Sequence, residues 1–270
     1  MEDIKIYELK RADLRGATVI DGFPSVGLVS TITANYLIST LKMEQIGILD
    51  SVHFPTVSVV RGSEPLNPVR IYSNSGSETY PESKIVVFIS EFQPPSNLIK
   101  MIAATILDWA QDQGCNLLIS PEGLVIDRGE GDEEEEENSE KNNNKKIGLE
   151  DLVVYGIGST VNARDLIGQH NIVQFQEGVI SGVAGVLLNE GKRRDFNVIS
   201  ILAEARPNYP DARAAAKVIE AIDKMLLKID IDVDPLLSEA AEIEAKIMAM
   251  QKQAKPGRDR PSAPVPDMYG

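Results

Sequence analysis

Two kinds of apolar pattern alternate along the first 230 residues. Short apolar runs bounded by glycine and proline predict β-strands at residues 17–21, 45–51, 56–60, 69–73, 84–90, 116–120, 151–158 and 197–202. Longer runs with apolar residues three and four positions apart predict helices at residues 26–41, 96–113, 161–167, 178–188 and 212–227. This alternation predicts an α/β fold, a three-layer sandwich in which helices cover both faces of a mixed, largely parallel sheet.

Individual residues set the expected ends of these elements. Residues 84–90 are apolar on both faces, as expected for a central strand covered by helices. Ser96 and Asp211 are placed to cap the helices that follow them, and Gly114 is placed to end the first of these. The strand at residues 116–120 is expected to break off at Pro121. The three short strands between residues 45 and 73 suggest an antiparallel excursion within the sheet.

The chain changes character after Ile231, where we expect the core domain, residues 1–231, to end. A separate amphipathic helix is predicted at residues 234–252, with apolar residues spaced four and three apart at Leu236, Ala240, Ile243, Ile247 and Met250. Two heptads are too few for an independently stable coiled coil, so this helix should lie on the domain or on a neighbouring subunit. Residues 253–270 are polar and proline-rich and predict a flexible tail.

A polar insertion interrupts the predicted core at residues 127–146, with five consecutive glutamates from Glu133 to Glu137. Such a run cannot repay its ordering entropy, so the sequence predicts a disordered segment. It is either an acidic docking arm or a solvated insertion in a surface loop. The tolerance of surface loops to insertions favours the second interpretation.

Composition narrows the functional classes. The formal charge of −14 argues against nucleic acid or an anionic membrane surface as partner, because both attract positively charged proteins. The single cysteine, the lack of an apolar signal sequence and the absence of a run of ~20 apolar residues predict a cytoplasmic protein that does not span a membrane.

Candidate chemistry is sparse. His53, His170 and Cys115 have no metal-ligand spacing, and structural roles are favoured for them. The sequence therefore predicts no metal and no cofactor.

The turn bounded by Gly22 and Gly27 precedes a helix and is an alternative anion site, although it lacks the Walker lysine and the GxGxxG pattern. Tight packing of the turn is the favoured explanation for its glycines. Glu91, Glu122 and Glu204 lie at predicted strand ends, where α/β folds collect catalytic groups, but no nucleophile or phosphate loop accompanies them.

Four passages together resemble the proteasome assembly chaperone family in its archaeal branch. They are DGFPSVG at residues 21–27, EFQPP at 91–95, GVISGVAG at 178–185 and YPD at 209–211. The similarity spans about residues 4–227. It implies an α/β sandwich related to nucleoside phosphorylases and an ATP-independent, non-enzymatic chaperone that binds proteasome α subunits. Members of the wider family have also been labelled ATP-grasp ligases, but no ATP-grasp pattern is identifiable here.

The last three residues, Met268, Tyr269 and Gly270, are similar to the hydrophobic-tyrosine-any (HbYX) motif of proteasome activators, which implies a proteasome-binding tail. A homo-oligomer is expected because residues 178–188 place glycines on one helix face and residues 234–250 carry an apolar seam. The expected assembly is a ring of about five copies. The alternatives are a nucleotide-binding enzyme, ATP-grasp-like or phosphorylase-like, that uses the turn between Gly22 and Gly27, and a structural ring scaffold whose tail is incidental.

Overall fold

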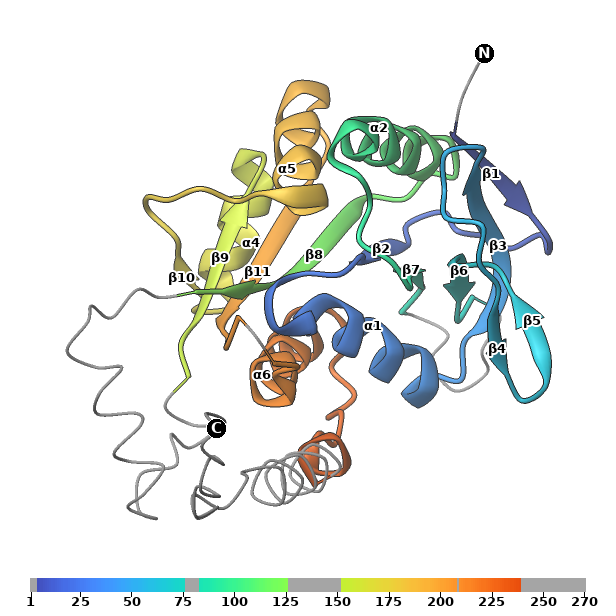
Figure 1. Cartoon of the computed structure of the whole chain (residues 1–270). Helices are drawn as coiled ribbons and strands as arrows, with labels where there is room; N and C mark the ends of the chain where they lie inside the picture. Colours follow the sequence, from blue (N-terminus) through green and yellow to red (C-terminus); the bar gives the residue numbers. More distant parts are fainter. Residues whose placement is uncertain (1–3, 76–82, 126–151, 208, 239–270) are drawn as a thin grey trace, which may run out of the picture.

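The computed structural model describes residues 4–75, 83–125, 152–207 and 209–238. Its centre is a nine-stranded sheet in the order β1-β3-β6-β7-β2-β8-β11-β9-β10, covered by helices on both faces (Figure 1). The predicted α/β class and its three layers are confirmed.

Four adjacent parallel strands form the middle of the sheet. These are β7 (Ile85–Ser90), β2 (Thr18–Gly22), β8 (Leu117–Leu124) and β11 (Val198–Glu204). On one side, β6 (Val69–Ser73), β3 (Glu44–Ser51) and β1 (Ile4–Glu8) continue the sheet in antiparallel pairs. On the other side, β9 (Val154–Gly158) is antiparallel to β11, and β10 (Val173–Gln174) is parallel to β9. The sheet is therefore mixed, with its parallel strands at the centre.

A small hairpin stands outside this sheet. β4 (Val59–Arg61) and β5 (Glu64–Leu66) pair only with each other. The predicted antiparallel excursion is confirmed for β3 and β6, but the strand predicted at residues 56–60 does not join them. Val60 is 68% exposed, so this segment lacks the apolar burial that would hold it in the main sheet.

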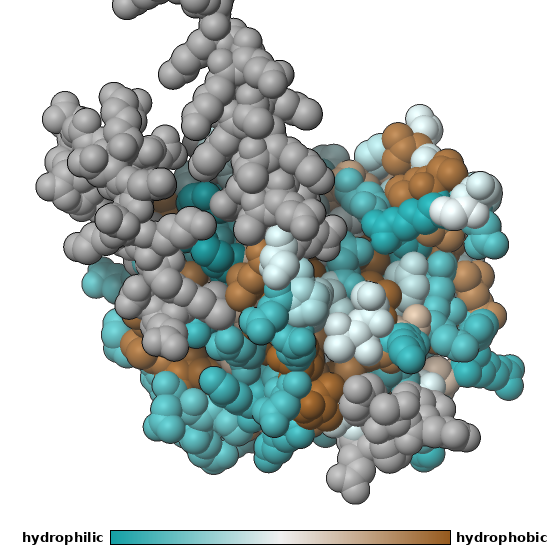
Figure 2. Space-filling model, turned by 90° about the horizontal axis from the view of Figure 1, so that it is seen from below, coloured by the Kyte–Doolittle hydropathy of each residue, from teal (hydrophilic) through white to brown (hydrophobic). Residues whose placement is uncertain are grey.

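Helices form the two outer layers (Figure 1). On one face lie α2 (Ser96–Asp112) and α5 (Gly182–Arg194). On the other lie α1 (Val29–Thr40), α4 (Val161–Gln169) and α6 (Ala212–Ile222), the last continued by a π-helical turn, Asp223–Leu227. Figure 2 shows the molecule from below, with apolar side chains scattered among hydrophilic ones.

Alternating side chains of the central strands supply two separate apolar cores. In β7, Val86 and Phe88 pack under α2, whereas Val87 and Ile89 pack against the opposite layer. All six residues of β7 are buried, which confirms the prediction of a central strand.

Helix capping agrees with the sequence at one of two predicted positions. Asp211 accepts a hydrogen bond from the Ala214 amide and caps α6, as predicted. Ser96 is not a cap, because Pro95 occupies the cap position and Ser96 is the first residue of α2.

Strand β8 does not break off at Pro121 but continues to Leu124. β2 pairs with β8 only as far as Ile119, so from Pro121 onward that side of β8 has no strand partner. The missing N–H of proline therefore costs no ladder hydrogen bond there, and β11 continues the pairing on the other side.

The predicted glycine-faced helix at residues 178–188 is wrong in its first part. α5 begins at Gly182, and Gly178 and Gly182 have positive φ angles of 155° and 72°. A Cβ on Gly185 would lie 2.2 Å from the carbonyl oxygen of Ile180, so the loop before the helix occupies the space that this glycine leaves. Gly185 therefore gives no support to a subunit contact.

Residues 234–238 are helical, and Leu236 packs with Val233 and Ile219. The rest of the predicted seam, the insertion at 127–146 and the tail at 253–270 lie outside the described residues. Within the ranges that the structure describes, no helix combines the length and the apolar character required to cross a membrane.

A substitution at Gly22 tests how closely α1 packs on the sheet. A Cβ there would lie 2.5 Å from the Cβ of Ala34 and 2.6 Å from the carbonyl oxygen of Phe88. We expect Gly22→Ala to lower the free energy of unfolding by roughly 1–3 kcal/mol, measured by urea denaturation. Gly168→Ala is the control, because nothing lies within 4 Å of its added Cβ. The control should be neutral or stabilising in α4, and equal losses in the two variants would contradict the packing argument.

Candidate functional site

The turn between β2 and α1 is held by its own hydrogen bonds. The Ser25 carbonyl accepts the Leu28 amide at 2.9 Å, and its hydroxyl oxygen accepts the Ser30 amide at 3.1 Å. Gly27 and Leu28 are both left-handed, with φ angles of 60° and 52°. The predicted start of the helix at Val26 is therefore corrected. Residues Val26–Leu28 form a 3₁₀ turn, and α1 begins at Val29 after a reversal of backbone handedness.

This turn packs onto the carboxyl ends of two central strands. A Cβ on Gly123 in β8 would lie 2.2 Å from the carbonyl oxygen of Val26. A Cβ on Gly27 would lie 3.1 Å from Ala205, which follows β11, and the Asp211 amide donates to the Gly27 carbonyl at 2.8 Å. The turn thus covers strand ends where parallel sheets commonly hold ligands.

These contacts account for the glycines without an anion. The amides of Phe23, Leu28 and Ser30, which a phosphate loop would present to its ligand, donate to acceptors within the same segment. Two acidic side chains, Asp21 and Glu122, lie near the ends of β2 and β8 and offer no positive charge to an anion. The geometry favours tight packing as the role of the turn.

Asp211 holds the turn, α6 and the preceding loop together. Its carboxylate accepts the Arg206 and Ala214 amides and lies 3.2 Å from Nε of Arg206. Burial raises the pKa of this carboxyl, but the positive charges of Arg213 and Arg206 and the amide hydrogen bonds outweigh it and lower the pKa overall. Asp211 of the YPD passage therefore has a structural role in the contacts described.

Asp21 is a buried carboxylate of a different kind, only 2% exposed. It accepts the Ser120 hydroxyl at 2.7 Å and the Phe23 amide at 3.1 Å. Burial raises its pKa to about 6 against the opposing effect of these two hydrogen bonds. Burial and the negative charge of Asp21 also raise the pKa of Glu122 well above its usual range. The negative charge of Asp21 thus disfavours the ionisation of Glu122.

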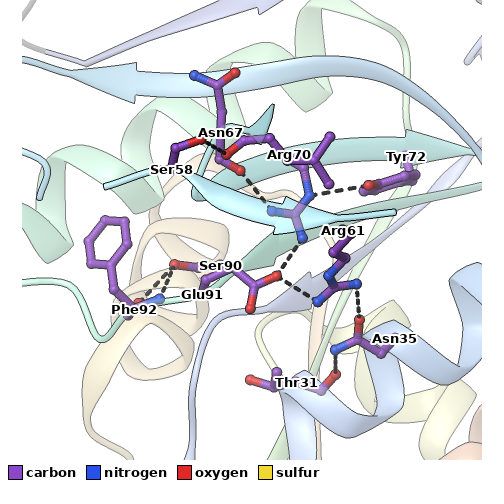
Figure 3. Close-up of polar contacts among 11 residues, drawn as sticks. Thr31, Asn35, Ser58, Arg61, Asn67, Arg70, Tyr72, Ser90, Glu91 and Phe92 are labelled. Atoms are coloured by element: carbon purple, nitrogen blue, oxygen red, sulfur yellow. Dashed lines mark hydrogen bonds and ion pairs between the residues drawn. The ribbon is translucent and has the colours of Figure 1, made fainter. Parts of the chain in front are cut away.

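A second polar cluster surrounds Glu91, which follows β7 (Figure 3). The guanidinium of Arg70 in β6 is completely buried, and it donates to the Glu91 carboxylate, to the Tyr72 hydroxyl at 3.1 Å and to the Asn67 carbonyl at 2.7 Å. These partners satisfy a charge that would otherwise be costly to bury.

Arg61 connects this cluster to the hairpin. From β4, its guanidinium reaches the same carboxylate oxygen of Glu91 at 2.8 Å and the side-chain oxygen of Asn35 in α1 at 3.4 Å (Figure 3). Glu91 thus ties the hairpin and strand β6 together, and a contact at the limit of hydrogen-bond length extends the cluster to α1.

The remaining candidate residues from the sequence do not gather at one site. Glu122 is within β8, and Glu204 is the last residue of β11. Cys115 is buried, and burial raises the pKa of its thiol to about 11, as expected for a structural cysteine. His53 and His170 lie in different parts of the chain, after β3 and α4. Met268, Tyr269 and Gly270 lie outside the described residues.

Among the residues that the structure describes, no three His, Cys, Asp or Glu side chains gather closely enough to hold one metal ion.

Sequence reasoning missed Asp21, Arg61 and Arg70 as interacting residues. Arg70 carried a signal, since a charged residue inside the otherwise apolar strand at 69–73 requires a buried partner. Asp21 carried one too, because it ends a strand of apolar residues. Each also has a partner distant in the sequence, such as Glu91 for Arg70, 21 residues away, and Ser120 for Asp21, 99 residues away, which local patterns do not reveal.

The fold and these contacts define an α/β domain in which a strand-to-helix turn closes over the ends of central strands. The chain belongs to the PAC2 family, whose model matches residues 19–251. An uncharacterised Methanocaldococcus jannaschii protein, MJ0106, is 25% identical to this chain, and the match covers 94% of this chain and 93% of MJ0106.

Solved structures share the fold. Pyrococcus furiosus PbaA, described as an archaeal homolog of proteasome-assembly chaperone, is 29% identical with a TM-score of 0.74, covering 92% of each chain. P. furiosus PbaB, described as an archaeal proteasome activator, is 23% identical with a TM-score of 0.74, covering 93% of this chain and all of its own. The family resemblance inferred from the four passages is confirmed, whereas no comparison tests the relation to nucleoside phosphorylases.

The raised pKa of Asp21 predicts a pH dependence of stability. A carboxyl with a folded pKa of about 6 binds its proton more tightly when folded than when unfolded, where its pKa is ~3.9. Its contribution to the free energy of unfolding is therefore greatest below pH ~4 and is lost as the pH rises to about 6.

Asp21→Asn should remove this component and stabilise the protein at pH 7.5 by on the order of 1–2 kcal/mol, because no carboxylate remains to be desolvated. Urea denaturation between pH 4 and pH 7.5 measures both effects. Asp112→Asn, at an exposed position, is the control. An unchanged pH slope in Asp21→Asn would contradict the assignment.

The buried Arg70–Glu91 pair predicts a large loss on removal of one partner. Arg70→Met leaves the Glu91 carboxylate without its buried counterion, and we expect a loss of roughly 3–5 kcal/mol in the free energy of unfolding. Lys10→Met is the matched control, because Lys10 and Glu44 form an ion pair with side chains 58% and 73% exposed. That change should cost less than about 1 kcal/mol. Similar losses in the two variants would show that burial does not distinguish the pairs.

Proposed function

We propose that this chain is a proteasome assembly chaperone or adaptor that acts by binding and without ATP. The observation that carries the proposal is the likeness to PbaA, described as a homolog of proteasome-assembly chaperone, which extends over 92% of both chains at 29% identity. The turn that could have formed a nucleotide site is packed against Gly123 and Asp211, which favours a binding role over the enzyme alternative.

The proposed binding element is the C-terminal tail, which enters a pocket between proteasome α subunits. Met268 supplies a flexible apolar side chain, and Tyr269 supplies a large ring with a hydroxyl that can form a hydrogen bond. The carboxylate of Gly270 pairs with a lysine of the pocket. Glycine at this position adds no bulk beside the carboxylate.

A proline-rich linker gives this tail its reach. Residues 253–267 would span about 45 Å if they adopt a polyproline-like conformation at ~3.1 Å per residue. We propose further that several copies assemble into a ring, so that several tails act together. Each tail buries little area and binds weakly, and simultaneous binding raises the effective concentration of the others.

Tail variants test this proposal by surface plasmon resonance on an immobilised archaeal 20S proteasome. Deletion of Met268, Tyr269 and Gly270 should remove most binding, as should Tyr269→Ala and the addition of one residue after Gly270, which displaces the carboxylate. Tyr7→Ala is the matched control, because Tyr7 is exposed on β1 and should not affect binding. Light scattering must show the same mass for all variants. Undiminished binding by the deletion variant would refute the role of the tail.

A further inference from the structure

The segment that leads from α6 toward the tail is fixed by unusual local structure. After the π-helical turn Asp223–Leu227, Lys228 and Asp230 are both left-handed, with φ angles of 54° and 55°. Left-handed backbone costs a non-glycine residue roughly 1 kcal/mol, so two such residues within three positions require compensating contacts.

Asp223 supplies part of that compensation. One of its carboxylate oxygens accepts the Ile229 amide at 3.1 Å and the other accepts the Ile231 amide at 3.2 Å. Its carbonyl also accepts the Lys228 amide at 2.7 Å. Asp223 is only 6% exposed, so both of its side-chain oxygens act from a buried position on the segment that follows the helix.

Apolar contacts and one tyrosine hold the next residues. Ala216 and Ile219 of α6 are completely buried in a cluster of their own, which Val233, Leu236 and Leu237 complete. Tyr36, from α1, packs in the same cluster and donates its hydroxyl to the carbonyl of Asp232. In Figure 1 this segment lies below the layer of α1 and α6, where the described chain ends at residue 238.

We propose that Asp223 and Tyr36 are positioning residues for the C-terminal tail, because they hold residues 229–237 against α6 and α1 and thereby fix the point from which the chain continues toward the tail at residues 253–270. This inference rests on the proposed function. A tail without a geometric task could depart directly from α6, as chain ends commonly do, and would need neither the buried carboxylate nor the two left-handed residues.

Loss of these contacts should lower the effective concentration of the tail at its pocket. Release of this segment frees ten residues, 229–238, and lengthens the linker between the domain and Met268. For a flexible linker the effective concentration falls roughly as the −3/2 power of its length, so the added residues lower it for each tail. Where several tails bind together, the loss repeats for each of them and becomes several-fold. The contacts of each tail with its own pocket are unaffected.

The test compares Asp223→Asn, Tyr36→Phe and the double variant with the matched exposed changes Asp112→Asn and Tyr7→Phe. Hydrogen exchange should be faster at amides 229–237 in the double variant, while the melting temperature stays within a few degrees. Binding of the full-length assembly to immobilised 20S proteasome should weaken several-fold. Deletion of ten linker residues, 254–263, from the double variant should restore most of the binding, which a merely structural defect would not allow.

Each failure has a separate meaning. If deletion of Met268, Tyr269 and Gly270 leaves binding intact, the proposed role of the tail is wrong. If that deletion abolishes binding but the double variant binds like the unmodified chain, the positioning role is overturned while the tail hypothesis stands. Unchanged hydrogen exchange at residues 229–237 would overturn the claim that Asp223 and Tyr36 hold this segment. If the shortened linker does not restore binding, the longer linker is not the cause of the weaker binding.

Discussion

Close packing between the β2–α1 turn and the ends of β8 and β11 is the constraint on which this structure depends most. The carbonyl of Val26 occupies the space above Gly123, and Gly27 lies against Ala205. Chain reversal at Gly27 and Leu28 makes this approach possible, and the hydrogen bond from the Asp211 amide to the Gly27 carbonyl holds it. The same contacts position α1 on one face of the sheet and join it to the start of α6.

Two buried charged side chains near the ends of the central strands differ in how their charge is compensated. Arg70 is completely buried but has a carboxylate, a hydroxyl and a carbonyl as partners, so its charge is balanced locally. Asp21 is equally inaccessible and has a hydroxyl and an amide as hydrogen-bond donors, and its raised pKa reflects the cost of burying the carboxylate. The first arrangement links the hairpin to the domain, whereas the second stores a pH-dependent destabilisation in the central strands.

The pattern of apolar residues predicted most of the helices and strands, because the residues that each element buries are set by its own sequence. Residues 84–90 are apolar on both faces and do form the buried strand β7, and the Asp211 cap follows from hydrogen bonds three residues along the chain. Errors arose where contacts outside the apolar pattern decide the outcome. Strand β8 continues through Pro121 because the distant strand β11 pairs beside it. Residues 178–181 are not helical, and the Ile180 carbonyl lies in the space that Gly185 leaves. Pairs such as Arg70 with Glu91 require the tertiary fold.

The candidate site was harder to predict than the fold, because the proposed binding residues belong to the chain end and not to the domain. The polar side chains at the strand ends form hydrogen bonds with one another within the domain. These contacts explain their presence there without a ligand. The binding chemistry proposed for Met268, Tyr269 and Gly270 needs no preformed pocket in this chain, because the pocket belongs to the partner. In this proposal the domain contributes geometry. Asp223, Tyr36 and the α6 surface hold residues 229–237. A weak contact at the chain end would then be made from a defined point on the domain.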